Sequence, residues 1–124
     1  MANIHLKDRK RAQKERLLFR EISQLFLHLT LDDARLREIT LSRLSLSPDK
    51  SMCTIYFYTP QGESYFKDVL EILKLYKPSL RKAIAEKIDA RYTPELRFTF
   101  DSHYEKQERF EQLMEKIKDE GESS

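Results

Sequence analysis

The sequence predicts an α+β fold, on three observations. Apolar residues recur at helical spacing in three parts of the chain, β-branched and aromatic residues form three strand-like runs, and turn-forming residues separate these segments. The predicted order is helix, strand, strand, kinked helix, strand, helix. Because 124 residues can fill one hydrophobic core, we expect a single domain over residues 1–118 and a flexible acidic tail over residues 119–124.

The first helix is predicted over residues 9–29. Its apolar stripe falls at i, i+4, i+7 and i+11, at Leu18, Ile22, Leu25 and Leu29. From residue 9 to residue 16 the chain is strongly basic, and Ala12 is its only apolar residue. We therefore expect this basic end of the helix to extend beyond the core, where a partner can reach it.

A hairpin is predicted over residues 39–59. Its first strand carries two apolar pairs of opposite parity, Ile39 with Leu41 and Leu44 with Leu46. A period of two cannot place both pairs on one face, so we expect a β-bulge near Ser42 and Arg43. Residues 47–51 form the turn, with Pro48 and Asp49 in favoured positions, and an aromatic, β-branched strand follows.

The second helix is expected to start at Ser64, as N-cap, and to be interrupted near its middle. Its apolar residues keep helical spacing on both sides of the interruption, at Phe66, Val69, Leu70 and Leu73 and then at Leu80, Ile84 and Ile88. Pro78 lacks an N–H and its ring crowds the preceding turn, so the helix should kink or stop there before resuming to about Ala90.

The third strand and the last helix are predicted from residue 95 onward. Leu96, Phe98 and Phe100 share one face of the strand. Ser102 and Glu105 have the spacing of a capping box. The helix that follows has one apolar face, made of Phe110, Leu113, Met114 and Ile117. We expect this C-terminal helix to pack on the three-stranded sheet.

Three motifs within residues 9–118 together resemble the ribosome-binding factor A family. Asp33, Ala34, Arg35 and Leu36 are similar to the family's Asp-Pro-Arg-Leu, and Leu46, Ser47, Pro48 and Asp49 are similar to its Val-Ser-Pro-Asp turn. The longest match is R-x-x-P-E-L-x-F-x-x-D, at Arg91, Pro94, Glu95, Leu96, Phe98 and Asp101. One departure is at the helical break, where Tyr76, Lys77 and Pro78 replace the family's Ala-x-Gly.

The resemblance implies a fold of the KH type II-like class and a function in ribosome assembly. A bacterial protein of this family is expected to bind the free small (30S) ribosomal subunit, to assist its late maturation, including 5′-end processing of 16S rRNA, and to act in cold adaptation. An ordinary KH domain grips the RNA backbone with a GXXG loop. Gly62 and Gly121 are the only glycines, so here RNA contact would depend on basic side chains.

Segregation of charge indicates which side chains these are. Residues 1–20 carry seven Lys or Arg against two acids, whereas eight acids and four bases follow from residue 101 onward. Residues 74–97 form a second basic cluster, with seven bases and three acids. The predicted RNA-binding residues are Arg9, Lys10, Arg11, Lys14, Arg20, Lys77, Arg81, Lys82 and Arg91.

Other function classes have less support from the residues. Cys53 lies in a predicted strand without a partnering base, and His5, His28 and His103 are far apart in the chain, so we expect no enzyme, cofactor or metal site. One cysteine and no membrane-length apolar run are typical of a cytoplasmic protein, which we expect to be monomeric. A module that binds a protein through the acidic last helix and the hairpin remains the alternative. Tyr56 and Tyr58 are weak candidates for base stacking.

Overall fold

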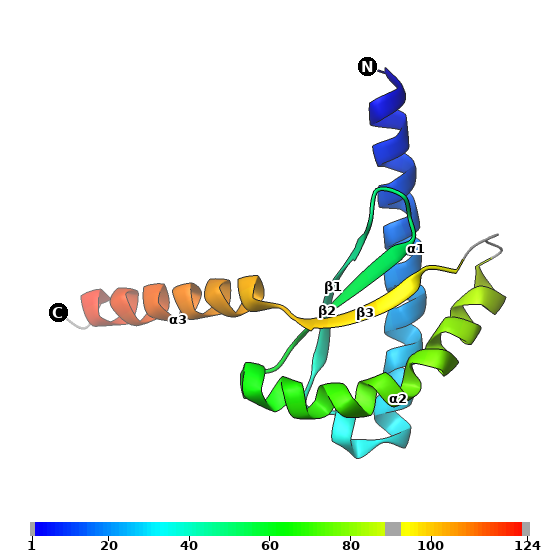
Figure 1. Cartoon of the computed structure of the whole chain (residues 1–124). Helices are drawn as coiled ribbons and strands as arrows, with labels where there is room; N and C mark the ends of the chain where they lie inside the picture. Colours follow the sequence, from blue (N-terminus) through cyan, green and yellow to red (C-terminus); the bar gives the residue numbers. More distant parts are fainter. Residues whose placement is uncertain (1, 89–92, 123–124) are drawn as a thin grey trace.

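The computed structural model describes residues 2–88 and 93–122, and these residues form an α+β fold (Figure 1). In chain order the elements are α1 (Ala2–Asp32), the 3₁₀ turn η1 (Ala34–Leu36), β1 (Thr40–Leu46), β2 (Met52–Tyr58), α2 (Glu63–Lys87), β3 (Glu95–Phe100) and α3 (Ser102–Glu122). The strand order is β1-β2-β3, with β1 antiparallel and β3 parallel to β2. The predicted α+β class and element order are confirmed, and the arrangement is that of the KH type II-like class.

The first helix follows the predicted stripe but is longer than predicted. Leu18 and Ile22 of the stripe are buried in the core together with the neighbouring Phe26, whereas Leu25 and Leu29 are half-buried against it. Figure 1 shows the N-terminal turns extending past the β1–β2 turn, so the predicted overhang is confirmed. At the other end, Arg37 donates from Nε to the carbonyl of Thr30 at 2.9 Å, which satisfies one of the open carbonyls that end the helix.

The hairpin has the predicted bulge. The pairing of β1 with β2 shifts register between Leu41 and Arg43, so the apolar side chains on both sides of the shift face the core. Phe57 of β2 then lies at the centre of the aromatic packing, with its ring centroid 5.3 Å from that of Phe26 and 5.8 Å from that of Phe98. One ring thus connects α1, β2 and β3.

Two details of α2 differ from the prediction. The N-cap is Gly62, at φ 92°, and not Ser64, because a positive φ ends the preceding turn and glycine adopts it without a Cβ clash. Pro78 lies inside the helix, which continues to Lys87 as one element. Figure 1 shows α2 bending along its length. A bend is expected because Pro78 cannot donate a hydrogen bond to the preceding turn.

The predicted packing of the C-terminal helix on the sheet is wrong. Figure 1 shows α3 projecting from the rest of the molecule, and its four apolar residues Phe110, Leu113, Met114 and Ile117 are between 49% and 62% exposed. The inner face of the sheet is already covered by α1 and α2, and the outer face offers polar and tyrosine side chains. Contact is limited to the start of α3, where the Tyr104 ring lies 4.6 Å from that of Tyr58.

The start and end of α3 also differ from expectation. The side chain that caps the helix is Asp101, whose Oδ1 accepts from the N–H of Tyr104 at 3.0 Å, so the expected box of Ser102 and Glu105 is not the cap. Its helical turns continue to Glu122, through most of the segment expected as a tail. The division of the chain at residue 118 stays a prediction.

Candidate nucleic-acid interface

The predicted basic residues of α1 lie where the helix leaves the core. Arg9 and Lys10 are exposed, and Arg11 and Lys14 are half-buried. Arg11 forms an ion pair with Asp8 at 3.6 Å. Within the described part of the chain, no carboxylate pairs with Arg9, Lys10 or Lys14, so these three charges are available to an external anion.

Helix geometry divides these residues between two sides of α1. At 100° per residue, Lys10, Lys14 and Glu21 fall in one row, since they are spaced at i, i+4 and i+11. Arg9 and Arg20 fall in a second row, about 100° away from the first. A single flat surface therefore cannot contact all of the predicted residues of α1 at once.

A salt bridge shows which row faces α2. Lys87 Nζ of α2 lies 3.3 Å from Glu21 Oε2 of α1, and Arg20 pairs with the other oxygen at 3.9 Å. Lys14 precedes Glu21 by two helical turns, about 10 Å, and Lys10 precedes it by about 16 Å. Lys10, Lys14 and Lys87 thus lie in one row, which we call the lysine row. Lys87 was absent from the predicted set, and its charge is paired with that of Glu21.

The predicted residues of α2 have different surroundings. Arg81 donates to the carbonyls of Thr93 and Pro94, both at 3.3 Å, and pairs with Glu95 at 3.3 Å, so it holds the chain that enters β3. Lys77 Nζ lies 5.4 Å from the centroid of the Phe98 ring.

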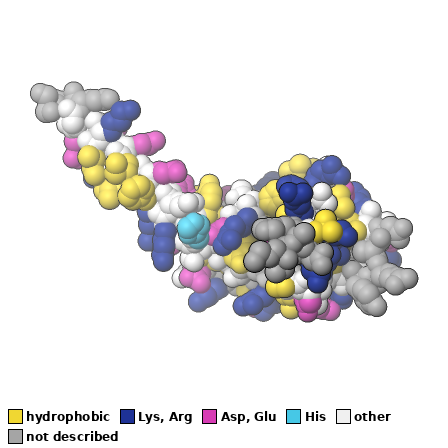
Figure 2. All heavy atoms as spheres, turned by 90° about the horizontal axis from the view of Figure 1, so that it is seen from above, with side chains coloured by type: hydrophobic (Ala, Val, Ile, Leu, Met, Phe, Trp, Pro, Cys, Tyr) yellow, Lys and Arg dark blue, Asp and Glu magenta, His cyan; other side chains and the backbone are white. Residues whose placement is uncertain are grey.

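Lys82 is exposed on α2 and pairs with no carboxylate among the residues that the structure describes. Arg91, the last residue of the predicted set, lies outside the described residues. On the face seen in Figure 2, Lys and Arg side chains are scattered over the body of the molecule rather than gathered in one patch.

A polar cluster that sequence reasoning missed connects α2 to the turn after α1. Tyr76 donates to Asp33 Oδ2 at 2.7 Å, and Arg35 donates to the same carboxylate from Nε and Nη2 at 2.9 and 2.7 Å. These hydrogen bonds, that from Arg35 first, hold the pKa of Asp33 well below its usual value. The sequence showed only that Tyr76 stands where the family has alanine, and its contact with Asp33, 43 residues earlier, depends on the fold.

The structure shows the surroundings of the residues that were considered for catalysis and metal binding. Cys53 is buried, and burial together with the negative charge of Glu15 raises the pKa of its thiol to about 12, so a reactive thiolate does not form near neutral pH. Among residues 2–88 and 93–122, no group of His, Cys, Asp and Glu side chains could hold a metal ion. In the same residues, no helix combines the length and apolar character needed to cross a membrane.

The two tyrosines considered for base stacking already have partners. The Arg43 guanidinium lies 3.8 Å from the centroid of the Tyr56 ring. Tyr58 packs on Tyr104, and its hydrogen bond to Glu108, with burial, raises the pKa of its hydroxyl to about 12. Each ring is thus already in contact with a neighbouring side chain.

The fold and the site together define a KH type II-like α+β domain with lysines along α1 and at the end of α2. The family model described as "Ribosome-binding factor A" matches residues 10–114. The chain therefore belongs to the ribosome-binding factor A family.

Individual relatives agree with this assignment. Ribosome-binding factor A of Halothermothrix orenii is 31% identical over 116 residues, which are 93% of this chain and 94% of that protein. The relative from Rhodopseudomonas palustris (strain BisB18) is 34% identical over 61% of this chain, and the chain spans only 55% of that protein's length.

Solved structures of the family share the fold. The crystal structure of ribosome-binding factor A from Thermus thermophilus superposes with a TM-score of 0.60 at 27% identity, over 72% of this chain and 93% of that chain. A homology model of the T. thermophilus protein, fitted into a cryo-EM map of a complex with the 30S subunit, gives a TM-score of 0.50 at 29% identity, over 72% and 88% of the two chains.

Proposed function

We propose that this protein is an assembly factor that binds the free 30S ribosomal subunit and assists its late maturation, including 5′-end processing of 16S rRNA. Membership of the family supports the proposal, and the complex of the T. thermophilus relative with the 30S subunit supports the choice of partner. The observation on this chain that carries it is the lysine row, which extends from the end of α2 along the overhanging turns of α1.

The lysine row suits a polyanion for a physical reason. Lys10 is exposed and Lys14 is half-buried, and neither pairs with a carboxylate among the described residues. Each rRNA phosphate that they neutralise releases counterions, so binding must weaken with salt. With about four phosphate contacts, the logarithm of the affinity should fall with a slope of roughly −3 against the logarithm of the salt concentration.

A pair of double variants tests this role. Lys10→Glu with Lys14→Glu should weaken co-sedimentation with purified immature 30S subunits at least about tenfold near 0.1 M salt, and should make the salt slope shallower by about 1.4. The matched control is Lys116→Glu with Lys118→Glu on α3, which changes the net charge equally. Equal losses in the two variants would show that only total charge matters, and the proposed surface would then be wrong.

The processing step has its own test. In a strain that lacks this protein, we expect 16S rRNA precursors with unprocessed 5′ ends to accumulate, and the wild-type chain to remove them. The variant at Lys10 and Lys14 should restore processing poorly, while the α3 control should restore it fully. Full restoration by both variants would show that 5′-end processing does not require the lysine row.

A protein-interaction module is the second candidate function, because the apolar face of α3 is exposed. In Figure 2 this face is visible as a group of hydrophobic side chains on the projecting helix. Ribonuclease treatment of the subunits distinguishes the two candidates. Loss of co-sedimentation after limited digestion favours contact with rRNA, and retention of binding to the remaining proteins favours the module.

A further inference from the structure

One side of α3 is apolar and has no cover among the described residues. Phe110, Leu113, Met114 and Ile117 are between 49% and 62% exposed, and Figure 2 shows hydrophobic side chains grouped on the projecting helix. Their spacing of i, i+3, i+4 and i+7 is the spacing by which a helix packs against a partner. We call these four residues the α3 stripe.

The opposite side of α3 holds the helix to the sheet. The Tyr104 ring lies 4.6 Å from that of Tyr58, and Glu108 lies next to the hydroxyl of the same Tyr58. At 100° per residue, Glu108 is about 180° from Ile117 around the helix axis. The α3 stripe is therefore directed away from the sheet, which does not cover it.

The charges of α3 are segregated around its axis. Between residues 102 and 121, α3 carries four bases and six acids. At 100° per residue, all four bases lie within about 110° of the centre of the α3 stripe, whereas four of the six acids lie farther round the helix. These bases are Lys106, Arg109, Lys116 and Lys118, and these acids are Glu105, Glu108, Glu115 and Asp119. The border of the α3 stripe is therefore mainly basic, and the back of the helix is acidic.

The bases at this border are available to a partner. All four are exposed. Arg109 pairs with Glu105 at 3.4 Å, but its side chain is 74% exposed, so this pair adds little stability. No carboxylate of the described residues pairs with Lys106, Lys116 or Lys118. A partner that carries acids beside an apolar surface would therefore complement α3.

A second copy of α3 does not match this border. In heptad terms, Phe110 and Ile117 are at position a, Leu113 is at d, and Arg109 and Lys116 are at g. Two antiparallel helices bring their g positions together, so Arg109 of one copy would face Lys116 of the other. Two parallel helices bring g against e, and the e positions of α3 hold no acid. Like charges oppose the first pairing, and no ion pair favours the second.

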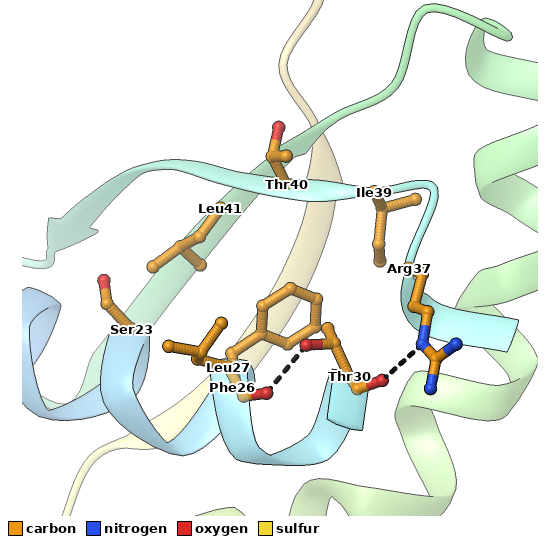
Figure 3. Close-up of a pocket in the computed structure, with 8 residues that line it drawn as sticks. All are labelled: Ser23, Phe26, Leu27, Thr30, Arg37, Ile39, Thr40 and Leu41. Atoms are coloured by element: carbon orange, nitrogen blue, oxygen red, sulfur yellow. Dashed lines mark hydrogen bonds between the residues drawn. The ribbon is translucent and has the colours of Figure 1, made fainter. Parts of the chain in front are cut away.

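The body of a second copy does not match the border either. Figure 3 shows an apolar hollow of about 380 Å³ between α1 and β1, with Phe26 among its lining residues. Its one charged residue is Arg37, which is bonded to the carbonyls that end α1. In the neighbouring hollow the one acid is Glu15, which already accepts from the N–H of Leu46. Neither hollow offers a free acid to the bases of α3.

We propose that α3 docks on an amphipathic helix of a protein partner, and that acidic residues border the apolar stripe of this helix. Its apolar side chains pack over Phe110, Leu113 and Ile117, and its acids lie beside Arg109 and Lys116. Charges at such border positions decide which helices pair. The contact goes beyond the proposed binding of rRNA and shares no residue with the lysine row. It also gives the protein-interaction module a defined kind of partner.

NMR titration of the ¹⁵N-labelled full chain tests the proposal. The probe is a three-heptad peptide with Leu at a and d and Glu at e and g, and the matched peptide has Lys in place of Glu. Like charges at e and g keep either peptide from pairing with itself. The Glu peptide should shift the amide signals of residues 106–118 and should bind at least about tenfold more tightly than the Lys peptide. Equal binding of both peptides, or shifts confined to other elements, would overturn the proposal.

Charge reversal at the border provides a second test. Arg109→Glu with Lys116→Glu should reverse the preference, so that the Lys peptide binds at least about tenfold more tightly than the Glu peptide. The matched control is Lys67→Glu with Lys74→Glu, because these two bases of α2 are also exposed and seven residues apart. The control should keep the preference of the wild type. If charge reversal lowers the helix content, Arg109→Gln with Lys116→Gln replaces it and should bind both peptides within about twofold. An unchanged preference in the α3 variant would contradict the proposed border contact.

Two exposed leucines provide variants of the apolar contact. Leu113 in the α3 stripe is 55% exposed, and Leu75 on α2 is 73% exposed. Leu113→Gln should weaken binding of the Glu peptide at least about tenfold, whereas Leu75→Gln should leave it within about twofold. Equal binding by these two variants would be incompatible with docking through the α3 stripe.

A different occupant would be seen in related measurements. If the wild type dimerises in sedimentation equilibrium and Leu113→Gln abolishes the dimer, a second copy covers the α3 stripe and the proposal fails. It fails also if a single-stranded RNA nonamer, or vesicles of phosphatidylglycerol, shift the signals of residues 106–118 and displace the Glu peptide. The variant at Lys10 and Lys14 should bind the Glu peptide as the wild type does. Failure of rRNA binding and failure of helix docking are thus seen separately.

Discussion

Asp101 is a buried carboxylate at the junction of β3 and α3, and its replacement by asparagine tests how this junction is held. The side chain is 2% exposed and accepts three hydrogen bonds. Oδ2 accepts from the hydroxyl of Ser42 at 2.6 Å and from Nε of Arg43 at 3.0 Å, and Oδ1 accepts from the N–H of Tyr104 at 3.0 Å. One residue thus joins the bulge of β1 to the first turn of α3.

The expected loss in the free energy of unfolding follows from which hydrogen bonds of Asp101 asparagine can keep. Asparagine caps a helix about as well as aspartate, so its oxygen keeps the bond from Tyr104 and its amide group then faces the donors of Ser42 and Arg43. Loss of the charge-assisted bonds should lower the free energy of unfolding by about 2 kcal/mol, and Asp101→Ala, which also removes the cap, by about 3 kcal/mol. For a domain of this size, 2 kcal/mol corresponds to a fall in melting temperature of about 8 °C.

The pH dependence gives this prediction a second readout. Burial alone raises the pKa of Asp101, but the hydrogen bonds from Ser42, Tyr104 and Arg43 outweigh it and the net pKa is lowered. A lowered pKa contributes stability that is present above the unfolded value of about 3.9 and is lost as the pH falls through the folded value. The difference between wild type and Asp101→Asn should therefore be full at pH 7 and should shrink below about pH 4.

Urea unfolding followed by far-UV circular dichroism at pH 7 and at pH 3 measures both effects. Asp119→Asn, at an exposed position of α3, is the matched control and should unfold as the wild type does at each pH. If Asp101→Asn were as stable as the wild type at pH 7, or lost the same free energy at both pH values, the assignment of charge-assisted bonds to Asp101 would be refuted.

Three further outcomes are expected. Phe57→Ala removes the ring at the centre of the core and should cost about 4 kcal/mol in urea unfolding, whereas Phe110→Ala on α3 should cost less than about 0.5 kcal/mol. Tyr76→Phe removes a hydrogen bond to Asp33, so the pKa of Asp33 should rise, as NMR titration of its carboxyl carbon can measure. Lys50 has φ 62°, so Lys50→Gly should raise stability by about 1 kcal/mol in the same unfolding assay.

Sequence patterns predicted the parts of the fold that depend on local spacing. The opposite parity of Leu41 and Leu44 required a bulge, because both side chains had to reach one core, and the bulge is present. The apolar spacing on α3 was equally clear, but spacing shows only that a face exists and not what covers it. Whether α3 reaches the sheet depends on the space left by α1 and α2, which a single sequence does not encode locally.

The sequence predicted which residues of the candidate site are charged, but not where their side chains lie. Arg81 and Lys82 are adjacent and carry the same charge. Arg81 nevertheless donates hydrogen bonds to two carbonyls at the entry to β3, while Lys82 is exposed. The two side chains point in directions about 100° apart around the helix axis, so only Arg81 faces β3. This strand lies 13 or more residues later in the chain, so local sequence does not show which side chain faces it. The role of Lys87 was missed for the same reason, because its partner Glu21 lies on another helix.

The position of the lysine row follows from the unequal lengths of the elements. A helix of 31 residues, such as α1, is about 46 Å long, whereas a strand of seven residues, such as β1, spans about 23 Å. A sheet built from such strands can cover only about half of the helix, so the rest must face solvent or a partner. Apolar residues would be costly there, and the chain instead has seven of its 23 basic residues within residues 1–20. The overhang therefore agrees with the dimensions of the fold, and its lysines carry the charge on which the proposed binding of a polyanion rests.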